Sequence, residues 1–231
     1  MSEVVSKINQ GLGNLETKFD LKRAELFFGL FLLFSFLSGV QAHLMAAVYP
    51  LTTKITDFLL LVVCVPILYF IYQRHRDNRL LWWVLITYWG TFFIEVIGVA
   101  TGNIFGVYHY GATMWIQWLE VPLVIALNWT LLILATNYIG WRITESPYLA
   151  AIIASVLIVL YDLCIEPVAI ALDYWQWAGG SIPVQNYIAW GLVALLFSLP
   201  LQLLKIRFQH PLLFIYAVAQ LVFFVLLLLL F

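Results

Sequence analysis

Seven stretches of the chain are almost purely apolar, and short polar or aromatic segments separate them. They cover residues 26–47, 57–72, 80–101, 119–139, 147–172, 183–204 and 211–231. A helix needs about 20 apolar residues to cross roughly 30 Å of bilayer hydrocarbon. All but the second stretch reach that length. The pattern predicts an all-α fold, a polytopic integral membrane protein with seven transmembrane helices.

Residues 1–25 are more polar and precede the first apolar stretch. No small-residue cleavage site follows, so we expect a retained helix rather than a signal peptide. Apolar residues recur in this arm at helical spacing, interrupted by two glycines: Val5, Ile8, Leu12, Leu15 and Phe19, with Gly11 and Gly13. We therefore expect two parts, a cytoplasmic amphipathic arm (1–25) lying on the membrane surface and a single seven-helix transmembrane domain (26–231).

Positive charge is distributed unevenly between the two sides of the predicted membrane. One side holds Lys7, Lys18, Lys22, Arg23, Arg74, Arg76, Arg79, Arg142, Lys205 and Arg207, whereas the other side holds only Lys54. Lysine and arginine concentrate in cytoplasmic loops. The expected protein is a multi-pass component of the inner (cytoplasmic) cell membrane, with its N-terminus in the cytoplasm and its C-terminus outside, which agrees with an odd number of spans.

Composition supports this interpretation and excludes other classes. Hydrophobic residues make up 64% of the chain and charged residues 10%, and the mean hydropathy is +0.98, which no water-soluble fold could bury. The net charge is −1 and the sequence has no basic stripe, which argues against binding of nucleic acid. Cys64 and Cys164 lie in apolar stretches without a CxxC motif, so we expect neither a disulfide framework nor a thiolate metal site.

Four acidic residues inside the predicted spans or at their edges are candidates for a functional site. They are Glu95 in the third span, Glu120 at the start of the fourth, and Asp162 and Glu166 in the fifth. Carboxyl groups in hydrocarbon are costly and usually serve a pathway or a reaction, although each of these could simply be protonated and hydrogen-bonded to a neighbouring helix. Asp162 and Glu166 are four residues apart and share a helix face. The predicted orientation places Glu95, Glu166 and His43 in the outer halves of their helices and Asp162 near the middle, which predicts one polar site.

Two outer loops, residues 102–118 and 173–182, lack lysine and arginine and are rich in Tyr, Trp, His and Gly. Aromatic residues are common at membrane interfaces, and that explanation suffices for any single tryptophan here. However, Tyr108, His109 and Tyr110 closely follow two glycines. We therefore hypothesise that this loop folds back over the acidic residues as a lid.

Such a site suits acid catalysis on an alkene. A carboxyl group in a pocket of low dielectric, near a second carboxyl, keeps its proton near neutral pH. Aromatic faces stabilise a carbocation, and a carboxylate orients the water that captures it.

Two motifs resemble the membrane carotenoid 1,2-hydratases, the family of the bisanhydrobacterioruberin and γ-carotene hydratases. The first is Glu95-x-x-Gly98-x-x-Thr101-Gly102-x-x-Phe105-Gly106-x-Tyr108-x-Tyr110, and the second is Asp162-x-x-x-Glu166-Pro167-x-Ala169. Further matches are Pro122-Leu123 with Trp129, the pair Trp175 and Trp177, and Pro183-x-x-Asn186 followed by Trp190. Ala189 and Glu166 depart from the family pattern, which has glycine and commonly aspartate there.

The resemblance implies addition of water to the terminal double bond of an acyclic carotenoid end group, without a redox cofactor. Asp162 or Glu166 is then the proton donor and Glu95 orients water, although Glu95 and Asp162 could exchange these roles. The expected substrate-binding residues are Tyr108, Tyr110, Trp129, Trp175, Asn186, Trp190, His43 and His109. The expected partners are a lipophilic carotenoid, membrane lipid and other carotenoid-pathway enzymes.

Three other functions share some of these sequence features. A carotenoid end-group cyclase or isomerase also begins by protonating an alkene, so it stays open. A proton-coupled transporter shares the intramembrane acids, but the inner halves of the helices look almost wholly apolar. A retinal photoreceptor needs a lysine in the last helix, which has none. His43 and His109 lack a second histidine at ligand spacing, and the acids lack the DxxxD pair that holds magnesium in prenyltransferases, so we expect no metal.

Overall fold

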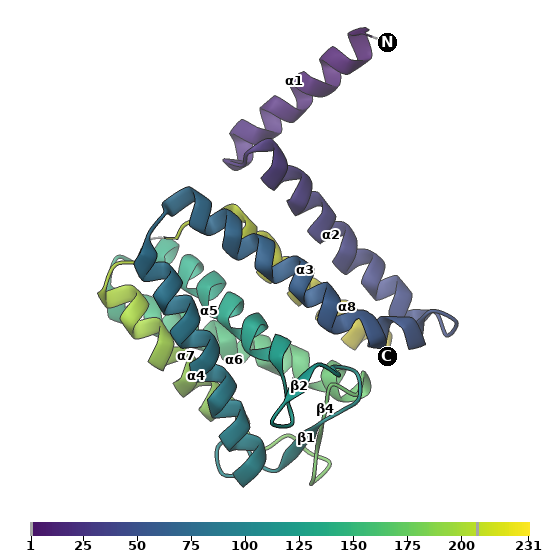
Figure 1. Ribbon diagram of the computed structural model, residues 1–231, viewed down its shortest axis with the longest axis vertical. Coiled ribbons are helices and arrows are strands. Elements are labelled where there is room, and N and C mark those ends of the chain that lie inside the picture. The colour runs from purple at the N-terminus through teal and green to yellow at the C-terminus, as the bar shows by residue number, and fades with distance from the viewer. Residues whose placement is uncertain (1, 207) are drawn as a thin grey trace.

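The computed structural model describes residues 2–206 and 208–231, and within them the chain forms eight helices (Figure 1). They are α1 (Ser2–Phe19), α2 (Arg23–Leu44), α3 (Tyr49–His75), α4 (Asn78–Thr101), α5 (Leu123–Ile143), α6 (Pro147–Ala171), α7 (Val184–Leu203) and α8 (Pro211–Leu230). In the described residues, the seven helices α2 to α8 are long and apolar enough to cross a membrane. The predicted all-α polytopic fold is therefore confirmed.

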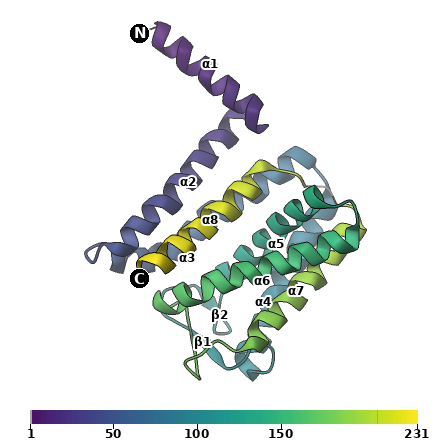
Figure 2. The ribbon, with the colours of Figure 1, turned by 180° about the vertical axis from the view of Figure 1, so that it is seen from behind.

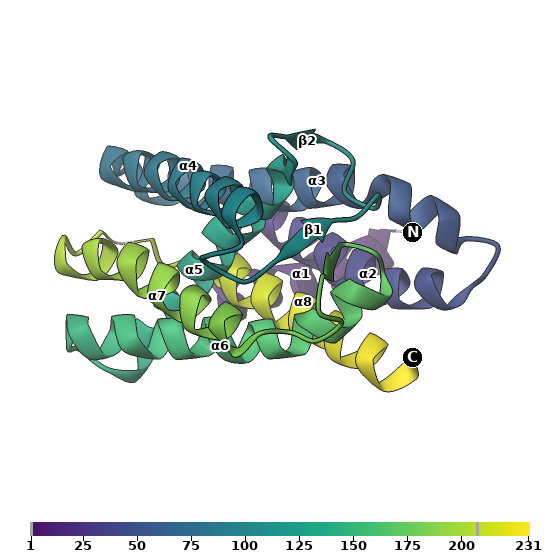
Figure 3. The ribbon, with the colours of Figure 1, turned by 90° about the horizontal axis from the view of Figure 1, so that it is seen from below.

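Helix α5 lies at the centre of the bundle. It contacts α3, α4, α6, α7 and α8, and its side chains are buried along almost the whole helix. Helices α4, α6 and α7 group on one side of it, and α2, α3 and α8 on the other (Figures 2 and 3). The other helices keep large apolar side chains exposed on their outer surfaces, as expected for helices that face lipid.

Two predicted spans, the second and the fourth, differ most from the structure in their bounds. Helix α3 is longer than the predicted second span because it includes Tyr49 to Thr56 and extends to His75. Helix α5 begins at Leu123 rather than at residue 119, because the preceding residues form a hairpin of β2 (Gln117–Trp118) and β3 (Val121–Pro122). Glu120 lies exposed in its turn with φ of 66°, so the prediction that it opens the fourth helix was wrong.

The two predicted outer loops join at one end of the bundle, which we call the aromatic end (residues 45–48, 102–122 and 172–183). Strand β1 (Tyr108–Tyr110) pairs antiparallel with β4 (Trp175–Trp177), with Tyr108 opposite Trp177. Successive side chains of a strand alternate between faces. Tyr108, Trp175 and Trp177 are accordingly buried beneath the ribbon, whereas His109 is exposed.

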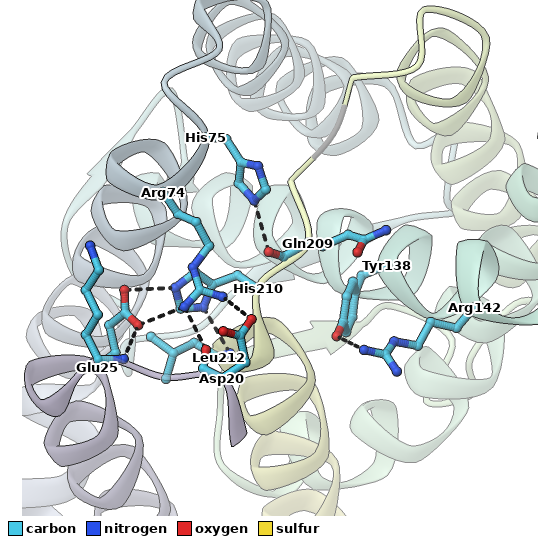
Figure 4. Close-up of polar contacts among 10 residues, drawn as sticks. Asp20, Glu25, Arg74, His75, Tyr138, Arg142, Gln209, His210 and Leu212 are labelled. Atoms are coloured by element: carbon cyan, nitrogen blue, oxygen red, sulfur yellow. Dashed lines mark hydrogen bonds and ion pairs between the residues drawn. The ribbon is translucent and has the colours of Figure 1, made fainter. Parts of the chain in front are cut away.

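A polar cluster with Glu25 and His210 buried at its centre lies at the opposite, basic end of the bundle (Figure 4). Arg74 of α3 donates to Asp20 Oδ2 and to Glu25 Oε2, each at 3.1 Å. His210 Nδ1 accepts a hydrogen bond from the backbone N–H of Leu212, so the proton of the neutral imidazole is on Nε2. This Nε2 lies 3.3 Å from Glu25 Oε1. This Glu25 cluster (Asp20, Glu25, Arg74 and His210) joins the start of α2 to the end of α3 and the start of α8.

Helix α1 projects from the start of α2, away from the bundle (Figure 1). It is helical as expected, but its place on a membrane surface stays a prediction. The side chains of Val5 and Ile8, which contributed to the expected apolar face, lie outside the described residues, as does Arg207 of the charge pattern.

Candidate functional site: a buried carboxyl cluster

Three of the acids predicted from the sequence meet beneath the β1–β4 ribbon. Glu95 comes from α4, and Asp162 and Glu166 come from one face of α6. All three are at most 3% exposed, and they line one cavity of about 20 Å³. None of the described residues that line this acid pocket is a lysine or arginine. The carboxyl groups therefore depend on hydrogen bonds rather than on positive charge.

Glu166 accepts three N–H hydrogen bonds. The indole nitrogens of Trp175 and Trp177 donate to its Oε2 at 2.9 Å and 3.0 Å, and the Asn186 amide donates to its Oε1 at 2.8 Å. The ribbon thus supplies two donors and α7 the third. A carboxylate can only accept hydrogen bonds, so this set of donors suits an ionised Glu166.

Asp162 has a different environment one helical turn away. Its Oδ2 accepts a 2.8 Å hydrogen bond from the same Asn186 nitrogen. Its Oδ1 is buried and has no hydrogen-bond partner among the described residues. A protonated carboxyl group has a hydrogen to donate at such an oxygen, whereas a buried carboxylate oxygen without a donor is costly. The geometry therefore suits a protonated Asp162 beside an ionised Glu166.

Glu95 lies opposite this pair and accepts a hydrogen bond from the Tyr108 hydroxyl. Tyr110 lines the same pocket. Burial, reinforced by the charge of Glu95, raises the pKa of both Tyr108 and Tyr110 well above the ordinary value for tyrosine. Both phenols therefore keep their protons even well above neutral pH, and the Tyr108 hydroxyl donates to Glu95.

Stacked rings form the inner wall of the acid pocket. Trp129 of α5 and Trp190 of α7 stack with their centroids 3.8 Å apart, and Phe105 stacks on the other side of Trp190 at 5.2 Å. Gly98 makes room for this stack, since a Cβ there would lie 2.5 Å from the Phe105 ring. The pocket is thus bounded by carboxyl groups and electron-rich ring faces.

The two histidines expected to bind substrate lie elsewhere. His109 is exposed on the outer face of β1 and does not line the acid pocket. His43 lines a second cavity of about 300 Å³, between α2, α3, α5, α6 and α8. The acid pocket therefore contains Tyr108, Tyr110, Trp129, Trp175, Asn186 and Trp190 of the expected substrate-binding residues.

Two buried contacts of acidic residues were not predicted from the sequence. Trp177 was interpreted as an interfacial tryptophan that matches the family, but its indole N–H donates a hydrogen bond to Glu166. The spacing of Trp175 and Trp177, with Gln176 between them, could have predicted that both indoles lie on one face of a strand. Asp57 was placed only at the edge of a span, yet it is buried within α3 and accepts the Trp115 amide at 2.9 Å. It thereby fixes the loop that leads to the β2–β3 hairpin.

The halves of the helices nearer the basic end, which the predicted orientation makes the inner halves, are more polar than predicted. The Asn137 amide donates to the Ser198 hydroxyl at 2.7 Å, and Gln202 donates to Asn137 Oδ1 at 2.8 Å. All three residues are buried between α5 and α7. They are neutral and bond largely to each other, so they join two helices without adding a titratable group.

The described residues contain no group of three or more His, Cys, Asp or Glu side chains that could hold a metal ion. The side chains that line the acid pocket are carboxyl groups, phenols, indoles and one amide. A 20 Å³ cavity is large enough for about one water molecule.

Comparison with known proteins gives one match. The sequence profile of a family described as "carotenoid biosynthesis protein" matches residues 55–231, which include α4 to α8 and every residue of the acid pocket. No curated protein and no solved structure matches the chain. Because the profile covers well over half of the sequence, the chain belongs to the carotenoid biosynthesis protein family.

Proposed function

We propose that this protein is a carotenoid 1,2-hydratase, a hydro-lyase that adds water to the terminal double bond of an acyclic carotenoid end group. Family membership supports a role in carotenoid biosynthesis. The observation that carries the finer assignment is the pairing of Asp162, which has a free buried oxygen, with Glu166, which has three N–H donors.

In the proposed reaction, Asp162 gives its proton to the terminal alkene carbon that becomes a methyl group, and the π bond breaks. A tertiary carbocation remains next to the ring faces of Trp129 and Trp175, which stabilise it by cation–π attraction. Water in the acid pocket forms the new C–O bond, and a carboxylate accepts the proton it loses. Transfer of that proton back to Asp162 restores the site, so alkene plus water gives a tertiary alcohol with no oxidant or reductant.

Glu95 is the proposed water-orienting residue. It faces the Asp162 and Glu166 pair across a cavity that fits about one water, and Tyr108 fixes one of its oxygens. A single enclosed water limits competing side reactions of the cation. The same arrangement would suit a cyclase if a second double bond of the end group attacked the cation, closing a ring by a new C–C bond, and the resulting ring cation then lost a proton. The product therefore distinguishes the two enzymes.

The experiment is expression in bacteria that accumulate lycopene or γ-carotene, followed by chromatography of the pigments with mass detection. A more polar pigment heavier by one water is expected from the wild type. Asp162→Asn and Glu95→Gln, both shown to be folded in detergent, should lose this product. Full conversion by both variants would contradict the proposal, an isomer of unchanged mass would indicate a cyclase, and unchanged pigments would favour transport or binding.

The proposed location is the cytoplasmic membrane, with the N-terminus and the basic end on the cytoplasmic side. The acid pocket would then lie near the outer surface, where water is available, and the carotenoid would reach it from within the bilayer. Reporter fusions to each terminus test this orientation, since an N-terminus outside the cell would overturn it.

A further inference from the structure

The second cavity, which His43 lines, is larger than the acid pocket and lies directly beside it. Trp129 and Trp175 line both. Its volume is about 300 Å³, and most of its lining is apolar, including Phe36, Leu60 and Phe223. An apolar protein cavity of about 150 Å³ stays dry and binds benzene. This cavity has roughly twice that volume, so it has room for a branched hydrocarbon group.

The two cavities differ in volume and in the side chains that line them, so each suits a different reactant of the proposed hydration. The acid pocket, at about 20 Å³, accommodates a water but not the five-carbon end of an isoprenoid chain. The larger cavity accommodates the end group but contains none of the three carboxyl groups. The reacting carbon and the water can therefore meet only at the boundary, where the two shared tryptophans lie.

The cavity borders the outer surface of the bundle on the side of α2 and α3. Ile55 of α3 lines it and is 43% exposed, on a surface that faces lipid in a membrane-spanning helix. Ser35, Ala42 and His43 of α2 line the same cavity. Helix α2 precedes the residues that match the family, so this wall is supplied by a part of the chain outside the match.

We propose that this cavity binds the apolar isoprenoid end group, while the remaining chain passes between α2 and α3 into the bilayer. Trp129 and Trp175 present the terminal double bond to the carboxyl groups, and the acid pocket holds the water. The inference rests on the proposed function for its reaction, but the binding of an apolar polyene can be measured without turnover. It makes α2 part of the substrate-binding wall.

Binding is tested with phytofluene, an acyclic polyene that absorbs where tryptophan emits, added to the full chain in nanodiscs. The chain has ten tryptophans, so occupancy of the cavity is the part of the tryptophan energy transfer that an excess of squalene, a non-absorbing acyclic isoprenoid, displaces. Ala42→Phe fills the cavity from α2, and Leu37→Phe is the matched control, since Leu37 lies on the same helix and is 56% exposed. Ala42→Phe should weaken binding and conversion by about tenfold or more, whereas Leu37→Phe should match the wild type.

The outcomes separate the two proposals. If folded Ala42→Phe binds phytofluene and converts carotenoid like the wild type, the cavity assignment is wrong, even when Asp162→Asn is inactive. If Asp162→Asn converts normally while Ala42→Phe no longer binds, the proposed function fails and the cavity stands as a polyene site. Leu60→Phe fills the same cavity from α3 and replaces Ala42→Phe if that variant does not fold.

Discussion

The Asn186 side-chain nitrogen lies 2.8 Å from Asp162 Oδ2, and it donates its second hydrogen to Glu166. One amide therefore sets the spacing of the two carboxyl groups. Asn186→Leu keeps the branching of the side chain at Cγ but removes both hydrogen bonds, each to an acid. We expect conversion to fall by about 10- to 100-fold, because such bonds contribute about 1.5–3 kcal/mol.

Gln185→Leu serves as the control for that change. Gln185 is the neighbouring residue on α7, but it is exposed and bonds to the backbone of Ile104 rather than to an acid. Pigment conversion in matched membranes is the measurement. Equal activity of Asn186→Leu and wild type would show that Asn186 does not position the acids.

Trp175→Phe and Trp177→Phe each remove one N–H donor from Glu166 while keeping an aromatic ring in place. We expect each to reduce conversion by about tenfold, and the double variant to lose more, because Glu166 then keeps only the Asn186 donor. Trp118→Phe is the control, since Trp118 is exposed and does not contact Glu166. A double variant no worse than either single one would count against Glu166 acting as an ionised carboxylate.

Gly98→Ala should displace the Phe105 ring, which lies 2.5 Å from where the new Cβ would be placed. Overpacking of this kind costs about 1–3 kcal/mol, so we expect a lower Tm in detergent together with reduced conversion. Gly179→Ala is the comparison, because the nearest atom to a Cβ there is 4.0 Å away. Unchanged stability of Gly98→Ala would mean that Phe105 can move without cost.

The His43 Nδ1 hydrogen bonds to the Gly39 carbonyl at 2.7 Å, so its buried Nε2 is an acceptor, and it has no partner among the described residues. A hydration product carries a hydroxyl donor, whereas its hydrocarbon substrate carries none. We therefore expect His43→Phe to weaken binding of a hydroxylated carotenoid end but not of phytofluene. Equal losses for both ligands would indicate a packing role instead.

Stability should depend on pH through His210. Burial, with the nearby charge of Arg74, lowers the pKa of His210 from 6.5 to about 4. Between these values the unfolded chain binds a proton that the folded chain does not. The free energy of unfolding should therefore decrease as pH falls from about 6.5 to about 4, by at most about 1.4 kcal/mol per pH unit.

His210→Asn tests this dependence because asparagine also caps a helix N-terminus. The side chain of His210 accepts the Leu212 amide, and asparagine can replace that contact without titrating. Thermal unfolding in detergent across this pH range should show a smaller pH dependence in the variant. Parallel profiles for the two proteins would rule out His210 as the source.

The sequence predicted the seven spans because polar or aromatic segments separate the apolar stretches, although it predicted the bounds of the second and fourth spans less well. It misplaced Glu120 because the apolar Leu119, Val121 and Leu123 continue the hydrophobic pattern through a tight hairpin turn. Pairing of β1 with β4 was not predictable, since the two strands are three residues long and lie more than sixty residues apart. Motif spacing pointed to Glu95, Asp162 and Glu166, but which N–H groups bond to Glu166 depends on that pairing.

Buried acids near the ends of helices were the harder case. Glu25 falls beside Lys22 and Arg23 in the sequence and therefore looks like part of an exposed polar arm. Its real partners, Arg74 and His210, come from distant segments. The sequence shows only the charges that neighbour Glu25 along the chain, whereas the burial of Glu25 depends on how α2 packs on α3 and α8.

The central position of α5 also constrains how the protein is assembled. Its two buried amides bond to later helices: Asn128 pairs with Tyr216 and Gln220 of α8, and Asn137, which also donates to the Ile133 carbonyl of α5, pairs with Ser198 and Gln202 of α7. During synthesis α5 leaves the ribosome before either partner exists. Its amides then lack these partners in hydrocarbon, at a cost of kilocalories per group. The hydrogen bonds that hold α5 in the bundle therefore form only after α7 and α8 have entered the membrane, so the last helices to be made complete the packing around α5.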